Sequence, residues 1–164
     1  MMDRVATRAR KAAPPVSLTM PAPMLEAVVH HLASALPNEG VGLLAIARRE
    51  TTAEAVRFFP GENIDASPSR YTMHPRDVVT ALDTIAAHGW ELGAIVHSHL
   101  SGPATPSRTD ISEAHYPDAV MLIVSLSSLP PEMRGWRLVE HDDGIAMRPV
   151  RLESTSPVAT AGAS

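Results

Sequence analysis

Residues 92–110 read LGAIVHSHLSGPATPSRTD and place two histidines and an aspartate at the end of an apolar run. The run over residues 92–96 predicts a short buried strand, and side chains two positions apart on a strand point the same way. We therefore expect His97 and His99 on one face, with Ser98 on the other. The glycine and prolines of the following loop would fold the chain back and bring Asp110 to the same place.

These three side chains are suited to a metal ion. Two imidazoles and one carboxylate make a three-ligand set that can hold a catalytic Zn²⁺ and leave the fourth tetrahedral position open. The same ligand types also bind iron in non-haem iron enzymes. The chain has no cysteine, which excludes thiolate zinc sites and the cysteine-ligated deaminase sites. The residues alone thus predict a metal site at His97, His99 and Asp110, with zinc and iron both open.

The rest of the chain alternates predicted strands and helices. A helix start is expected at residues 107–110, with Ser107 or Thr109 as the N-cap. A loop of about fifteen residues, long enough to have a function, opens at Pro60. Interleaved strands and helices predict an α/β or α+β fold. Apolar periodicity predicts strands over 16–20, 41–48, 53–59, 119–126, 136–140 and 145–148, and helices over about 24–36, over 75–88 and from Asp110 onward.

Composition bounds the possible functions. With 164 residues and 45% hydrophobic content, the chain can bury one core, and we place one domain at residues 16–150. Residues 1–15 and 151–164 are expected to form a disordered N-terminal tail and a flexible C-terminal tail. A net charge of −4 with scattered basic residues argues against nucleic acid as a partner. We expect no membrane span and no signal peptide, and hence a cytoplasmic protein.

The stretch from His97 to Asp110 resembles the signature of the JAMM, or MPN-plus, metalloisopeptidases. That signature is His-Ser/Thr-His-Pro, a short variable loop, and then Pro-Ser-x-x-Asp. Leu100 stands where most members carry proline, a departure that removes no ligand. Family members also carry a glutamate just before an apolar strand, and Glu39 has that place here. Residues 63–71 and 116–120 are similar to segments of prokaryotic members, so the resemblance spans about residues 16–149.

The resemblance implies a fold and an activity. The fold would be a curved mixed β-sheet flanked by helices, the JAB/MPN domain, similar to the cytidine deaminase-like arrangement. One Zn²⁺ per chain would activate a water, Glu39 would act as the general base, and Ser107 would stabilise the oxyanion. Asn63 and Tyr71 would be substrate-binding residues of the long loop.

The implied reaction is hydrolysis of a peptide or isopeptide bond after the C-terminal Gly-Gly of a ubiquitin-like or sulfur-carrier protein. The extended tail of that partner would lie along a sheet edge by strand addition. Some relatives of this fold have lost their ligands and serve as scaffolds, so a non-catalytic interaction subunit is the alternative. A non-haem iron enzyme is a further alternative, but it gives Glu39 no role.

Overall fold

The computed structural model describes residues 13–155. Residues 1–12 of the expected N-terminal tail and residues 156–164 of the expected C-terminal tail lie outside this range. No helix in the described range is long and apolar enough to cross a membrane. In chain order the elements are β1 (Ser17–Pro21), α1 (Ala22–Ser34), β2 (Val41–Arg49), β3 (Thr52–Gly61), α2 (Pro75–Ala87), β4 (Glu91–His99), α3 (Arg108–Ser112), β5 (Val120–Ser125), β6 (Glu132–His141) and β7 (Gly144–Thr155).

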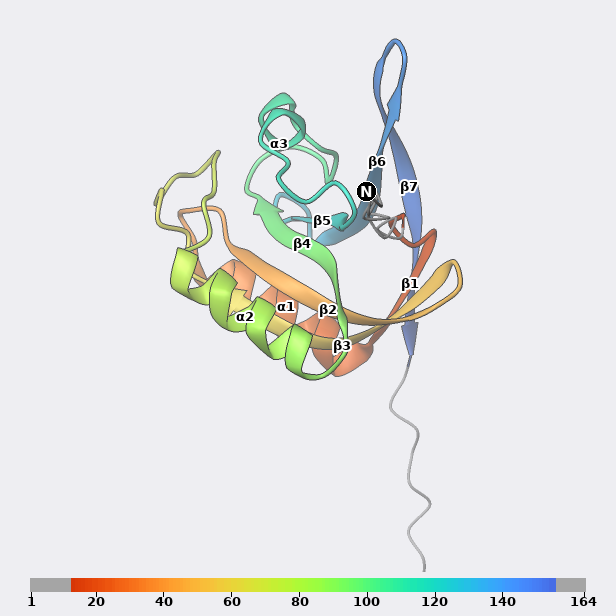
Figure 1. The fold of residues 1–164 in the computed structure, drawn as a ribbon. Helices are drawn as coiled ribbons and strands as arrows, with labels where there is room; N and C mark the ends of the chain where they lie inside the picture. The colour runs from red at the N-terminus through yellow and green to blue at the C-terminus, as the bar shows by residue number, and fades with distance from the viewer. Residues whose placement is uncertain (1–12, 156–164) are drawn as a thin grey trace, which may run out of the picture.

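The strands form one mixed, curved sheet with the order β1-β3-β2-β4-β5-β6-β7, flanked by helices (Figure 1). The pairs β1–β3, β4–β5 and β1–β7 are parallel, and the other neighbours are antiparallel. This confirms the mixed α and β fold expected from the sequence. The sheet also closes on itself, because β1 pairs with β7 from Ser17↔Arg151 to Pro21↔Thr155. Residues 151–155, which we expected in the flexible tail, are therefore part of the sheet.

The central strands each contain a continuous apolar run because both faces of the sheet are covered there. On β2, Leu44 and Ile46 belong to the core cluster that includes Val28 and Leu32 of α1. The alternate residues Val41, Leu43 and Ala45 pack in a second cluster with α2. Helices α1 and α2 accordingly lie on opposite faces of the sheet (Figure 1). Strands buried on both faces are expected to contain continuous apolar runs, as residues 41–47 of β2, 92–96 of β4 and 120–124 of β5 do.

The helix boundaries follow from local chemistry. Helix α2 begins after His74, whose Nδ1 accepts a hydrogen bond from the Arg76 N–H at 3.0 Å, and Pro75 occupies its first turn. Gly89, with φ +68°, follows the end of α2, as its place after the periodic residues indicated. The hairpin of β6 and β7 is longer than expected, and Figure 1 shows it projecting beyond the rest of the sheet, close to the side where α3 lies.

Candidate metal centre

Strand β4 presents the two histidines on the same face. His97 is paired with Val41 of β2 and with Ile123 of β5, so it lies in the middle of the sheet and its side chain is fully buried. His99 ends the strand and keeps only 11% of its side chain exposed. The Nε2 atoms of the two rings lie 3.2 Å apart. The two rings therefore lie on one face of β4, as the alternation of side chains along a strand predicts.

Asp110 reaches the histidines from α3. Its Oδ1 lies 3.3 Å from His97 Nε2, and its Oδ2 lies 3.1 Å from His99 Nε2. Oδ2 also accepts the backbone N–H of Ser107 at 2.8 Å, while Ser107 Oγ accepts the backbone N–H of Asp110 at 3.1 Å. This reciprocal pair is a capping box at the start of α3. The hydrogen bonds that begin the helix therefore also orient the carboxylate.

The protonation of the three side chains is suited to a cation. For Asp110, burial works against ionisation, but hydrogen bonds from both imidazoles and from the Ser107 N–H outweigh it and hold its pKa well below the usual range. Burial lowers the pKa of His97, which favours the neutral form of that ring. For His99, burial is opposed by the hydrogen bonds to Asp110 and to the Pro103 carbonyl, and its pKa is raised. A metal ion at His99 would therefore compete with a proton for this ring.

The donor set fits a metal ion. One ligand atom each from His97, His99 and Asp110 lies within 4.8 Å of the other two, and all three residues are buried. His99 Nδ1 lies 2.9 Å from the Pro103 carbonyl, so this nitrogen is the one that donates and the Nε2 lone pair is left for a ligand bond. Two nitrogens and one carboxylate oxygen, close together, are a set that Zn²⁺ prefers.

Glu39 is buried beside this cluster, with 5% of its surface exposed. Its Oε2 has no hydrogen-bond partner among the described residues. Burial raises the pKa of the Glu39 carboxyl to about 7, with His99 opposing the rise and Asp110 adding to it. A buried carboxyl that titrates near neutrality, with an unpartnered oxygen, is able to accept and release a proton.

The backbone around Glu39 is fixed by contacts from distant segments. Gly40 is tied to Ser98 in both directions: its N–H donates to Ser98 Oγ at 2.8 Å, and its carbonyl accepts from Ser98 N–H at 3.1 Å. A Cβ at Gly40 would lie 2.8 Å from Leu32 Cα, so only glycine allows α1 to pack this closely. The Glu39 N–H donates to the Ser67 carbonyl at 2.9 Å. Glu39 is thereby held at the end of β4.

Asn63, which we expected to bind substrate, makes its side-chain hydrogen bonds within the protein. Its Nδ2 donates to the carbonyls of Glu39 and Arg70, each at 3.0 Å. Its Oδ1 accepts the N–H groups of Asp65 at 3.1 Å and Thr72 at 3.0 Å. These four bonds use both amide hydrogens and both oxygen lone pairs. The Asn63 side chain therefore organises the loop and is left without a donor or acceptor for a substrate.

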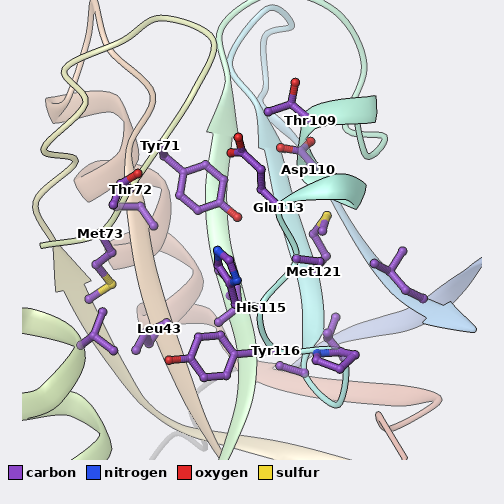
Figure 2. A pocket seen from close by; sticks show the side chains of 18 of the residues that line it. Leu43, Tyr71, Thr72, Met73, Thr109, Asp110, Glu113, His115, Tyr116 and Met121 are labelled. Carbon is purple, nitrogen blue, oxygen red and sulfur yellow. The ribbon is translucent and has the colours of Figure 1, made fainter. Parts of the chain in front are cut away.

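Tyr71 stacks on the His97 ring, with centroids 4.6 Å apart and an angle of 29° between the planes. It also lines a pocket of about 270 Å³ that continues from the cluster, with Asp110 on the opposite wall (Figure 2). An ion pair between Arg70 and Glu113 joins the same two walls. Sequence reasoning missed this pocket and this ion pair, because both depend on how two loops meet. The base of the pocket is apolar and includes Leu43, Met73, Val78, Ile95, Met121 and Leu138.

Ser107 stands at the exposed start of α3, next to the cluster. Its Oγ accepts the Asp110 N–H, which leaves the hydroxyl hydrogen available to another acceptor. Of the seven site residues expected from the sequence, the structure thus brings His97, His99, Asp110, Glu39 and Ser107 to one place. Tyr71 stacks on His97 of that group, and Asn63 is hydrogen-bonded to the backbone of Glu39.

Comparison with known proteins agrees with this geometry. A protease from Thermus thermophilus described as a probable TtuB-protein conjugate cleaving protease is 41% identical over 100 residues, which is 60% of this chain and 64% of that protein. The chain thus spans less than two thirds of that relative. The CysO-cysteine peptidase of Mycobacterium tuberculosis is 29% identical over 136 residues, covering 82% of this chain and 90% of that protein.

A solution structure of a protein from Desulfitobacterium hafniense superposes with a TM-score of 0.73 at 29% identity, over 88% of this chain and 97% of that one. The model of the family described as prokaryotic homologs of the JAB domain matches residues 21–139. The family expected from the sequence is therefore confirmed. The chain belongs to the prokaryotic homologs of the JAB domain, the JAMM-type family that its residues 97–110 resemble.

Proposed function

We propose that this chain is a zinc-dependent peptidase that cleaves a peptide or isopeptide bond after the C-terminal Gly-Gly of a ubiquitin-like or sulfur-carrier protein in the cytoplasm. The observation that carries the proposal is the convergence of His97, His99 and Asp110 beside the unpartnered buried carboxylate of Glu39. The names of the relatives support the substrate class, because one is a conjugate-cleaving protease and the other a CysO-cysteine peptidase. A scaffold would have no use for this arrangement.

His97 Nε2, His99 Nε2 and the Asp110 carboxylate would hold the ion. When bound, a Zn²⁺ ion lowers the pKa of a water at its open position and polarises a neighbouring carbonyl. The capping box keeps the Asp110 carboxylate in place, and the Pro103 carbonyl fixes the tautomer of His99. These contacts hold the ligand atoms close together before any ion arrives, which reduces the reorganisation that binding requires.

Glu39 would move the proton. Its carboxylate takes a proton from the attacking water at Oε2 and passes it to the departing amine. In the metal-free protein, burial raises the pKa of this carboxyl to about 7, so both of its protonation states are accessible near neutral pH. The Ser107 hydroxyl, free to donate, would stabilise the negative charge that develops on the carbonyl oxygen.

The apolar pocket beside Tyr71 and Asp110 would receive the extended tail of the partner. Residues without a Cβ would allow the tail backbone to approach the cluster closely, which supports a Gly-Gly ending. The sheet-edge position that we expected for the tail stays a prediction, because β1 pairs with only Thr52–Glu54 of β3 and the rest of that edge has no strand partner among the described residues. The tail is more simply accommodated between the loop of residues 62–74 and α3, the segments that form the two walls of the pocket.

The proposal is tested with a ubiquitin-like protein whose Gly-Gly end is fused to a short peptide. We expect the zinc-loaded protein to release the peptide by hydrolysis after the second glycine, as followed by mass spectrometry, and a chelator to stop the reaction. Glu39→Ala is expected to keep its zinc and lose turnover, since the ligands remain and the base is gone. Asp110→Ala is expected to lose both. A fully active Glu39→Ala protein would overturn the proposed base.

A further inference from the structure

The two histidines of the cluster are held in different ways. The His99 ring is oriented by a hydrogen bond, because its Nδ1 lies 2.9 Å from the Pro103 carbonyl. His97 Nδ1 is buried and has no hydrogen-bond partner among the described residues. In metal sites the second ring nitrogen usually donates to a fixed acceptor, and this bond sets the direction of the ligand lone pair. Once Nε2 binds a metal ion in place of its contact with Asp110, something other than a hydrogen bond at Nδ1 must therefore orient the His97 ring.

The flat group against the His97 ring is the phenol ring of Tyr71. Their centroids are 4.6 Å apart and their planes are inclined by 29°, which is a stacked arrangement. The His99 ring is farther away, at 5.1 Å, and inclined by 57°, so it cannot support the His97 ring face to face. Rotation of the imidazole about its Cβ–Cγ bond would drive its edge into the Tyr71 ring. The stack therefore restricts the motion that the missing hydrogen bond leaves free.

Tyr71 can play this part because its own backbone is anchored on both sides. The carbonyl of Arg70 accepts from Asn63 Nδ2 and the N–H of Thr72 donates to Asn63 Oδ1, each at 3.0 Å. The ends of the loop are joined as well, since Ile64 N–H donates to the Thr72 carbonyl at 2.9 Å. One asparagine side chain thus fixes the residues before and after Tyr71 and presents its ring to His97.

We propose that Tyr71 is a positioning residue for the metal centre: its ring, and not its hydroxyl group, holds the His97 imidazole in the orientation that binds metal. This inference rests on the proposed metal site. It also gives Tyr71 a role beyond the substrate contact expected from the sequence. Its consequence is that the order of the loop of residues 62–74 contributes to metal affinity, although no residue of this loop is a ligand.

The test compares Tyr71→Phe with Tyr71→Leu in the full chain. Phenylalanine keeps the stacked ring and removes the hydroxyl, whereas leucine fills part of the space without a flat face. Affinity for Zn²⁺ is measured by competition with a chromogenic chelator, and the site geometry is followed by the absorption spectrum of bound Co²⁺. Tyr71→Leu is expected to bind Zn²⁺ about 10- to 100-fold more weakly with an altered Co²⁺ spectrum. Tyr71→Phe should match the original protein in both.

The chain offers a matched control in a second imidazole stack. Trp90 lies on the His88 ring at 4.2 Å and 18°, and neither residue belongs to the metal cluster. Trp90→Leu removes an aromatic ring from a histidine in the same way and should leave Zn²⁺ affinity unchanged. Thermal unfolding of the metal-free proteins reports whether each variant folds. If Tyr71→Leu does not fold, Tyr71→Met takes its place, because methionine adapts to an irregular space.

The outcomes separate the two proposals. An original protein that binds no Zn²⁺ contradicts the proposed function itself. An original protein that binds Zn²⁺, with a folded Tyr71→Leu protein of equal affinity, contradicts only the role of Tyr71. Equal losses in Tyr71→Phe and Tyr71→Leu assign the effect to the hydroxyl and also overturn the inference.

Discussion

At the residue scale, the burial of Glu39 has two opposite effects: it raises the pKa of the proposed base, and it lowers the stability of the metal-free fold. Its buried carboxyl has a pKa near 7, compared with 4.5 for a free side chain, because burial disfavours the charged form. Between these two values the unfolded chain binds fewer protons than the native one, so stability falls as pH rises. A shift of about 2.5 units corresponds to about 3 kcal/mol. The residue proposed as the base therefore destabilises the metal-free fold at neutral and alkaline pH.

The substitution Glu39→Gln should restore the stability that the native protein loses at neutral and alkaline pH. The variant cannot ionise, so the metal-free protein is expected to gain stability relative to the original as pH rises from 5 to 8, by up to about 3 kcal/mol. Below pH 4.5 the native and unfolded carboxyls are both protonated, and the pH-dependent part of the difference disappears. Urea unfolding at several pH values, in the presence of a chelator, measures the difference. A constant gap between the two proteins across this range contradicts the raised pKa.

The residues of the site differ in how far the sequence predicts them. His97 and His99 are predictable because a strand places alternate side chains on one face. Asp110 is predictable because a capping box has an acidic residue three positions after its N-cap, which is Ser107 here. The place of Glu39 came from the family resemblance, since its segment is joined to β4 by contacts between Gly40 and Ser98, 58 residues apart. No local pattern predicts such a contact.

At the scale of elements, α3 shows how a helix of five residues serves the site. Ser107 contributes two separate groups: its backbone N–H orients Asp110, and its hydroxyl caps the helix and is free to donate. The first contact survives substitution of the side chain and the second does not. This separation makes the proposed oxyanion role testable without loss of the metal site.

Ser107→Ala should therefore keep its Zn²⁺ and lower kcat by about 100- to 1000-fold, the usual effect of removing one oxyanion donor. Loss of the N-cap is expected to cost about 1 kcal/mol of stability. Ser107→Thr retains a hydroxyl and the cap, and serves as the matched control. Metal analysis and steady-state kinetics on the same samples measure both effects. An equal kcat in the alanine and threonine variants contradicts the proposed role of the hydroxyl.

At the scale of the whole molecule, closure of the sheet joins the two ends of the described chain. Five residue pairs connect β1 with β7, from Ser17↔Arg151 to Pro21↔Thr155. Leu152 packs against the core cluster that contains Leu18 and Val150. Residues 151–155 are mostly polar and were therefore expected to belong to a tail. However, apolar residues at alternate positions, such as Val150 and Leu152, are also typical of a strand with one buried face. Parallel pairing across such a sequence distance leaves no local signal, so the closure could not be predicted.

The closure predicts a large effect from a small truncation. A chain ending at Val150 loses the five β1–β7 pairs and the contacts of Leu152 with the core, and should be at least about 3 kcal/mol less stable than a chain ending at Thr155. The comparison uses chains with the same N-terminus, so that only residues 151–155 differ. Because β1 and β7 contribute no ligand, the shorter chain should still bind Zn²⁺ at low temperature if it folds. Chemical denaturation gives the stability difference, and equal unfolding midpoints for the two chains would show that β7 adds nothing to the sheet beyond Val150.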